Sequence, residues 1–82
     1  MFITYILYSK SLDKYYVGHT QNLDDRLKRH NQGRSKSTKS GLPWIVVYTE
    51  TFKTKSEAYQ REMHIKKQKS KSYIERLIES AG

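Results

Sequence analysis

Short apolar runs alternate with polar segments along the first quarter of the chain. Residues 2–8 are almost all β-branched or aromatic, and both alternating sets of side chains in this run are apolar. This pattern favours a central strand that is covered on both faces. Polar residues 9–13 interrupt the run, and the strand pattern resumes over residues 14–20. The two segments therefore predict a β-hairpin.

A helix is predicted after the hairpin. Asn22 precedes Leu23 as an N-cap, and Asp24 and Asp25 follow in the first turn, where they favour the positive end of the helix dipole. Gly33 is expected to end this helix. Residues 33–43 are rich in Gly, Ser and Lys and predict a mobile basic loop.

The second half of the chain predicts one more strand and two helices. Residues 44–52 have the strand pattern, and a capping box of Thr54 and Glu57 opens the next helix. Ser72 is expected to cap a last short helix. The order ββαβαα predicts an α+β fold in which a three-stranded antiparallel sheet is flanked by helices, within a single domain of residues 1–82.

Composition narrows the class of protein. Hydrophobic residues make up 35% of the 82 residues, a small but sufficient stock for a core because aromatic residues are plentiful. The absence of cysteine excludes disulfides and thiolate metal sites. No apolar run approaches the roughly 20 residues that span a bilayer, and the first residues lack the pattern of a signal peptide. We therefore expect a cytoplasmic protein without a membrane partner.

Charge points to a polyanionic partner. Sixteen Lys and Arg face eight Asp and Glu, a formal net charge of +8. Ten of these basic residues form two clusters: Arg26, Lys28, Arg29, Arg34, Lys36 and Lys39, then Lys66, Lys67, Lys69 and Lys71. Such an excess on a small domain indicates nucleic acid, with DNA the first expectation. The alternative is a basic surface that only keeps the chain soluble.

Five residues carry groups suited to phosphoryl transfer. Arg26 and His30 are four residues apart and share a face of the first predicted helix. Tyr5 and Tyr16 lie on the two hairpin strands, and Glu62 lies on the second helix. A carboxylate can hold a hard cation, a guanidinium can meet a phosphate, and a phenol or imidazole can handle the proton of an attacking water. From the residues alone, both tyrosines also suit a core, and Glu62 could simply pair with Lys66.

Four ordered motifs resemble those of the GIY-YIG nuclease superfamily. They read Thr4-Tyr5-Ile6, Tyr16-Val17-Gly18, Asn22-Leu23-x-x-Arg26-Leu27-x-x-His30-Asn31 and Glu57-Ala58-x-x-x-Glu62-x-x-Ile65-Lys66. The resemblance covers residues 2–67. The chain looks most like compact single-domain members, which are related to the N-terminal domain of the nuclease component of the excision-repair endonuclease.

The resemblance implies a role for each matching position. Tyr16 would act as the general base or would position the attacking water, and Tyr5 would orient that water or the phosphate. Arg26 would neutralise charge on the phosphate, and His30 would support a tyrosine or contact the phosphate. Glu62 would be the sole protein ligand of one Mg²⁺ or Mn²⁺ ion. Expected nucleic-acid contacts are Gly18, His19, Lys28, Arg29, Arg34, Lys36, Lys39, Lys66 and Lys67.

The expected function is metal-dependent endonuclease cleavage of DNA, with repair or recombination as the candidate setting. Specificity would come from a protein partner or from DNA shape, or would be absent. Many superfamily members place an asparagine after the glutamate helix, and residues 67–82 contain no counterpart. The alternative is therefore a catalytically weak or inactive module with the nuclease fold that binds nucleic acid. A basic adaptor for an acidic protein is the third class of function.

Overall fold

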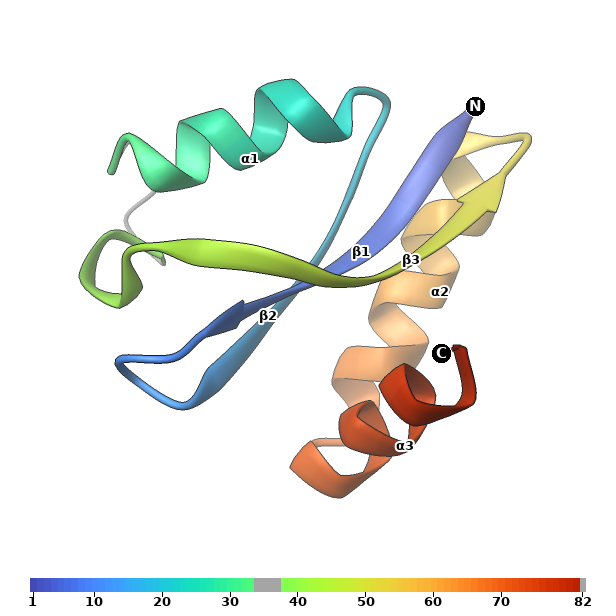
Figure 1. Ribbon diagram of the computed structural model, residues 1–82. Coiled ribbons are helices and arrows are strands. Elements are labelled where there is room, and N and C mark those ends of the chain that lie inside the picture. The colour runs from blue at the N-terminus through green and yellow to red at the C-terminus, as the bar shows by residue number, and fades with distance from the viewer. Residues whose placement is uncertain (34–37, 82) are drawn as a thin grey trace.

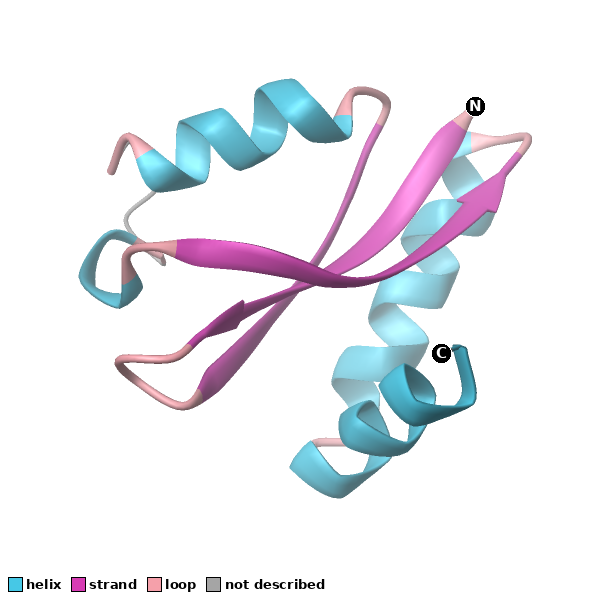
Figure 2. Ribbon diagram, in the orientation of Figure 1, coloured by secondary structure: helices cyan, strands magenta, loops and turns pink. Residues whose placement is uncertain are grey.

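The computed structural model describes residues 1–33 and 38–81 and contains the strands and helices in the predicted order (Figures 1 and 2). The elements are β1 (Phe2–Ser9), β2 (Lys14–Thr20), α1 (Leu23–Asn31), the short 3-10 helix η1 (Lys39–Gly41), β3 (Trp44–Phe52), α2 (Lys55–Lys67) and α3 (Lys71–Ala81). The described helices are all too short and too polar to cross a membrane.

The sheet is antiparallel throughout, in the order β2-β1-β3. The central position of β1 agrees with its apolar residues on both faces, and the predicted α+β fold is confirmed. In the β1–β2 register Tyr5 pairs with Gly18 and Leu7 pairs with Tyr16. Because paired residues project from the same face, this register places the two tyrosines side by side.

The sheet separates two small hydrophobic clusters. On one face Tyr5, Leu7 and Trp44 are buried and pack against the apolar stripe of α1, formed by Leu23 and Leu27. On the other face Ile6 and Val17 pack with Ile65 of α2 and with apolar side chains of α3. Figure 1 shows the resulting layers, with α1 on one side of the sheet and α2 and α3 on the other.

The starts of the first two helices agree with their predicted caps. The side chain of Asn22 accepts a hydrogen bond from the backbone N–H of Asp25 at 3.0 Å. The Thr54 hydroxyl accepts from the backbone N–H of Glu57 at 3.2 Å. Each oxygen satisfies a donor that has no partner inside its helix, which is why both helices begin where the sequence predicted.

The predicted cap of the last helix was wrong. α3 begins at Lys71, so Ser72 lies within its first turn. Ser70 is the capping residue, because its hydroxyl accepts a hydrogen bond from the backbone N–H of Tyr73 at 3.1 Å. Lys69, with φ of 48°, turns the chain after α2 and leaves Ser70 as the first residue free to cap.

The segment after α1 was expected to be a mobile loop over residues 33–43. Gly33 has φ of 73°, the left-handed conformation that commonly ends a helix, as predicted. Residues 34–37 lie outside the described part of the chain. The remainder is not simply a loop, because Lys39–Gly41 forms η1.

Candidate active site

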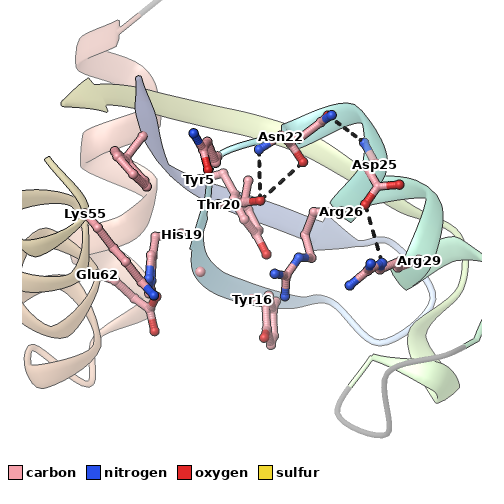
Figure 3. Close-up of a pocket in the computed structure, with 13 residues that line it drawn as sticks. Tyr5, Tyr16, His19, Thr20, Asn22, Asp25, Arg26, Arg29, Lys55 and Glu62 are labelled. Carbon is pink, nitrogen blue, oxygen red and sulfur yellow. Dashed lines mark hydrogen bonds and ion pairs between the residues drawn. The ribbon is translucent and has the colours of Figure 1, made fainter. Parts of the chain in front are cut away.

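A cleft of about 640 Å³ opens between α1, the edge strand β2 and α2 (Figure 3). Its walls include Tyr5 and Tyr16 from the sheet, Arg26 from α1 and Glu62 from α2. Four of the five residues expected to carry chemistry therefore line one cavity, although they come from four different elements.

The two tyrosines project from the same face of the hairpin, as their register requires. Their ring centroids are 6.4 Å apart and the ring planes are inclined by 29°. Tyr5 is 1% exposed, and burial raises the pKa of its phenol well above the ordinary value, so it remains protonated and can donate a hydrogen bond. Tyr16 is only half-buried, so its ring is the more accessible of the two from the cleft.

Gly18 makes room for Tyr5. A Cβ at Gly18 would stand 2.6 Å from the Tyr5 hydroxyl and 2.8 Å from Cζ of the same ring. The group that requires this space is the phenol of Tyr5 on the paired strand.

His30 lies beneath the tyrosines and does not line the cleft. It is 2% exposed, its Nε2 is 3.2 Å from the Tyr5 hydroxyl, and its ring meets the Tyr16 ring edge-on with centroids 4.9 Å apart. Burial, and then the positive charge of Arg26, lower the pKa of His30 and favour the neutral imidazole. Of the two roles that the resemblance implied, this position suits support of a tyrosine rather than contact with phosphate.

Thr38 holds the other side of that imidazole and was not found from the sequence. Its hydroxyl is 2.8 Å from Nδ1 of His30, and its backbone carbonyl accepts a hydrogen bond from Nε1 of Trp44 at 2.6 Å. Thr38 is fully buried, although its neighbours along the chain are Ser and Lys. Nothing in that polar segment distinguishes it, because its burial results from contact with a distant helix.

Arg26 is directed into the cleft by the packing of its helix. Leu23 and Leu27 of α1 are packed against the sheet, which leaves the side chain of Arg26 over the cavity. Figure 3 shows its guanidinium reaching from α1 towards Tyr16. One turn further along, Arg29 also lines the cleft and pairs with Asp25 at 3.4 Å. The α1 wall thus presents two guanidinium groups to any ligand in the cavity.

Glu62 reaches the cleft from the helix on the opposite face of the sheet, past the edge of β2. It is 8% exposed. Its Oε1 is 2.6 Å from Nδ1 of His19, and its Oε2 accepts a hydrogen bond from Nζ of Lys66 at 2.6 Å. The pairing of Glu62 with Lys66, which the sequence left open as an alternative, is therefore present in the structure.

The donor set at Glu62 suits an ion that keeps most of its water. Across residues 1–33 and 38–81, no three His, Cys, Asp or Glu side chains are clustered so that they could hold a metal. A single carboxylate is nevertheless enough for Mg²⁺ or Mn²⁺ when water and substrate oxygens fill the other positions. Lys66 is 44% exposed along its side chain and has space to release Oε2.

The residues expected to contact nucleic acid are not all at the cleft. Gly18, His19 and Arg29 line it, whereas Lys28 and Lys39 are exposed outside its walls. Lys66 and Lys67 are exposed on the last turn of α2. Arg34 and Lys36 lie outside the described residues.

Lys55 is a cleft residue that the sequence reasoning missed. It lines the cavity from the first turn of α2 and stands in Figure 3 on the same wall as Glu62. Lys55 precedes Glu62 by two helical turns, so helical periodicity places both on one face. That spacing was the signal that could have identified it.

Three comparisons bear on the family. The family model of the GIY-YIG catalytic domain matches residues 1–75. A UPF0213 protein of Bacillus licheniformis is 46% identical over 65 residues, which cover 78% of this chain and 66% of that protein. A UPF0213 protein of Bacillus subtilis is 40% identical over 67 residues, covering 77% and 68%. The chain thus spans about two thirds of the length of these relatives.

A solved structure extends the comparison to the fold. The solution NMR structure of a UPF0213 protein from Bacillus halodurans has a TM-score of 0.61 and 33% sequence identity. The similarity covers all of this chain and 87% of that one. With the family match over residues 1–75 and the relatives above, it shows that the chain belongs to the GIY-YIG domain family and to the UPF0213 proteins within it.

Proposed function

We propose that residues 1–82 form a single domain that hydrolyses phosphodiester bonds in DNA with the help of a divalent metal ion. The observation that carries this proposal is the meeting of Tyr5, Tyr16, Arg26 and Glu62 around one cleft. Membership of the GIY-YIG family supports a nuclease-type fold. The positive charge of the chain supports a polyanionic substrate.

Each wall of the cleft has a distinct task in this proposal. The hydroxyl of Tyr16 orients the attacking water or accepts its proton, while Tyr5, held protonated by burial, donates a hydrogen bond to the water or phosphate. Arg26 compensates the negative charge that grows on the phosphate as the water oxygen attacks and the ester bond breaks. Glu62 holds the ion, Mg²⁺ or Mn²⁺, which when bound polarises the phosphate and acidifies water.

The same structure contains an observation that favours the alternative, a nucleic-acid-binding module with little or no activity. Both oxygens of Glu62 are engaged, one by His19 and the other by Lys66. While His19 and Lys66 both keep their contacts with Glu62, no ion reaches the carboxylate, and the cleft only binds the phosphate backbone. Residues 68–82 contain no asparagine, which agrees with this alternative.

The setting of the activity forms part of the proposal. The cleft presents cationic side chains and tyrosines that suit the phosphate backbone of DNA. Contacts with that phosphate backbone carry no sequence information. Specificity would then come from a protein partner or from the shape of the DNA, which suits repair or recombination in the cytoplasm.

Incubation with supercoiled plasmid tests the proposal. The wild-type protein should nick the plasmid with Mg²⁺ or Mn²⁺ and leave it intact with EDTA, and a structured RNA serves as the second substrate. Glu62→Gln and Tyr16→Phe should both bind DNA and fail to cut it. The matched control is His64→Gln, a change at an exposed histidine on the same helix as Glu62 but outside the cleft.

Two results would redirect the assignment. A wild-type protein that binds DNA but never cuts it, across a titration of both ions, would be the binding module. Cleavage by Glu62→Gln at the wild-type rate would show that the metal site is elsewhere.

A further inference from the structure

His19 and Glu62 meet at the wall of the cleft in a way that goes beyond a single-carboxylate metal site. We infer that Nδ1 of His19 is a second protein ligand of the ion and that the pair selects Mn²⁺ over Mg²⁺. This inference rests on the proposed function, since it concerns the ion held at Glu62. Its basis is the 2.6 Å separation between Nδ1 of His19 and Oε1 of Glu62.

The spacing of the two atoms suits neighbouring positions around one ion. Ligands about 2.1 Å from an octahedral cation, at right angles to each other, are about 3.0 Å apart. The observed separation must therefore open by about 0.4 Å, and the proton shared by Nδ1 and Oε1 must leave for solvent, before both atoms can face an ion in this geometry. Both residues line the same cavity, so an ion can approach them from solvent.

Rigid elements hold both side chains. His19 belongs to β2, where it pairs with Thr4 of the central strand, and its ring is 21% exposed. Tyr59 of α2 meets the imidazole edge-on, with ring centroids 5.7 Å apart. Glu62 lies one turn further along α2 and is nearly buried. Ligands fixed in this manner lose little freedom when an ion binds.

Lys66 determines which oxygen of Glu62 is available. Its ammonium binds Oε2 at 2.6 Å, so Oε1 is the oxygen turned towards His19. The carboxylate can therefore use Oε1 for the ion while Lys66 remains on Oε2. Under this arrangement the contact with Lys66 orients the metal ligand instead of blocking it.

The charge of the cleft favours a nitrogen ligand. Arg26 and Lys55 line the same cavity, and Glu62 already shares its charge with Lys66. Mg²⁺ depends on oxygen ligands, and only Asp25 and Glu62 supply carboxylates among the described residues that line the cleft. Mn²⁺ also prefers oxygen, but as a transition-metal ion it accepts an imidazole nitrogen more readily than Mg²⁺ does. The nitrogen of His19 would add a ligand for Mn²⁺ where a further carboxylate is not at hand. The pair should therefore distinguish the two ions.

Metal binding without turnover tests the inference. The fraction of free Mn²⁺ is measured by electron paramagnetic resonance during titration, and Mg²⁺ is added as competitor. Removing a residue that only supports a metal ligand typically weakens metal affinity by about tenfold or more. Removing a direct ligand should cost at least as much, so His19→Gln should weaken Mn²⁺ binding by about tenfold or more. Mg²⁺ affinity should change much less. His64→Gln is the matched control and should bind both ions as the wild type does.

Pulsed resonance of Mn²⁺ bound to the wild-type protein gives a readout that needs no variant. A directly bound imidazole produces a nitrogen coupling, which changes when histidine is labelled with ¹⁵N. The expected result is that coupling in wild type and its loss in His19→Gln.

Two outcomes would overturn the inference while leaving the metal site at Glu62 in place. The first is Mn²⁺ binding by the wild type without a nitrogen coupling. The second is equal Mn²⁺ affinity in wild type and His19→Gln, provided that Glu62→Gln binds no Mn²⁺. Failure of the wild type to bind either ion would instead remove the proposed metal-dependent function itself.

Discussion

The hydroxyl of Tyr5 lies directly over Gly18, its partner across the β1–β2 ladder. A Cβ at Gly18 would stand within 3.0 Å of two atoms of the Tyr5 side chain. The ring has no space to move away, because Tyr5 is almost completely buried and its hydroxyl is hydrogen-bonded to Nε2 of His30. The position of this phenol in the cleft is therefore set by the absence of a side chain on the neighbouring strand.

Gly18→Ala should displace the Tyr5 ring. Overpacking of this kind costs about 1–3 kcal/mol, and we expect a loss of stability in that range by urea denaturation. The rate of plasmid cleavage should fall by more than the loss of folded protein explains, because the hydroxyl of Tyr5 moves. The same change in a Tyr5→Leu background should cost less, since the colliding atoms are gone. An equal cost in both backgrounds would show that the strain lies elsewhere.

Thr38→Val should leave Nδ1 of His30 buried without a partner. An unsatisfied buried polar group costs about 1–3 kcal/mol, which urea denaturation can detect. Thr38→Ser keeps the hydroxyl and should retain most of the stability. The ¹⁵N shifts of the His30 ring should report a changed tautomer only in the valine variant. Wild-type shifts in Thr38→Val would contradict the proposed support of His30 by Thr38.

Stability should fall as the pH is lowered through the ordinary titration range of histidine. The pKa of His30 is lowered from 6.5 in the folded protein, so below about pH 6.5 the unfolded chain binds a proton that the folded chain does not. This contribution is complete above pH 6.5 and is lost as the pH falls towards the folded pKa. The urea midpoint of wild type should drop between pH 7.5 and pH 5.5.

The drop should be smaller in His30→Gln, which has no imidazole at this position. His64→Gln removes an exposed histidine instead and should keep the wild-type drop. A His30→Gln protein with the full pH dependence would assign the effect to other groups.

Arg29→Ala should reduce the salt dependence of DNA binding. Arg29 lines the cleft, and the slope of log K against log salt should fall by about 0.9 for every phosphate of duplex DNA that the variant no longer neutralises. Its ion pair with Asp25 is more than half exposed on both sides, so stability should hardly change. Lys28→Ala, on the same helix but outside the cleft walls, should lower the slope less. A larger effect at Lys28 would move the binding surface to the outer face of α1.

Ser70→Ala should destabilise α3, whereas Ser72→Ala should not. Loss of a serine N-cap costs about 1 kcal/mol, and only Ser70 caps this helix. Ser72 lies inside the first turn, where alanine is the better helix former. The melting temperatures of the two variants are compared with that of the wild type. A larger decrease in Ser72→Ala than in Ser70→Ala would support Ser72 as the capping residue after all.

The features that sequence predicted correctly depend on local patterns. The apolar residues on both faces of β1 indicated a central strand, and the caps at Asn22 and Thr54 fixed the starts of α1 and α2. Tyr5 and Tyr16 share a face because Leu7 pairs with Tyr16 across the hairpin and side chains alternate along each strand. These relations involve residues that are neighbours in the chain or across one turn.

The features that sequence reasoning missed depend on contacts formed only in the folded chain or on a backbone conformation that residue type does not predict. Thr38 resembles its polar neighbours until η1 brings it against His30. His19 was expected to contact nucleic acid, and its pairing with Glu62 appears only when β2 and α2 are placed together. The cap at Ser70 depends on the positive φ of Lys69, a conformation that is uncommon for lysine and is not predicted by the residue type.

The division of the core into two clusters ties the proposed activity to complete folding. The tyrosines and Arg26 depend on the cluster beneath α1, whereas Glu62 depends on the cluster beneath α2. A chain that has formed only one layer lacks either Glu62 or the tyrosines and Arg26, so it would not assemble the proposed site. If the proposed cleavage is the function, a misfolded copy that has lost either layer would also be inactive, so the two-layer core would limit cleavage to fully folded protein.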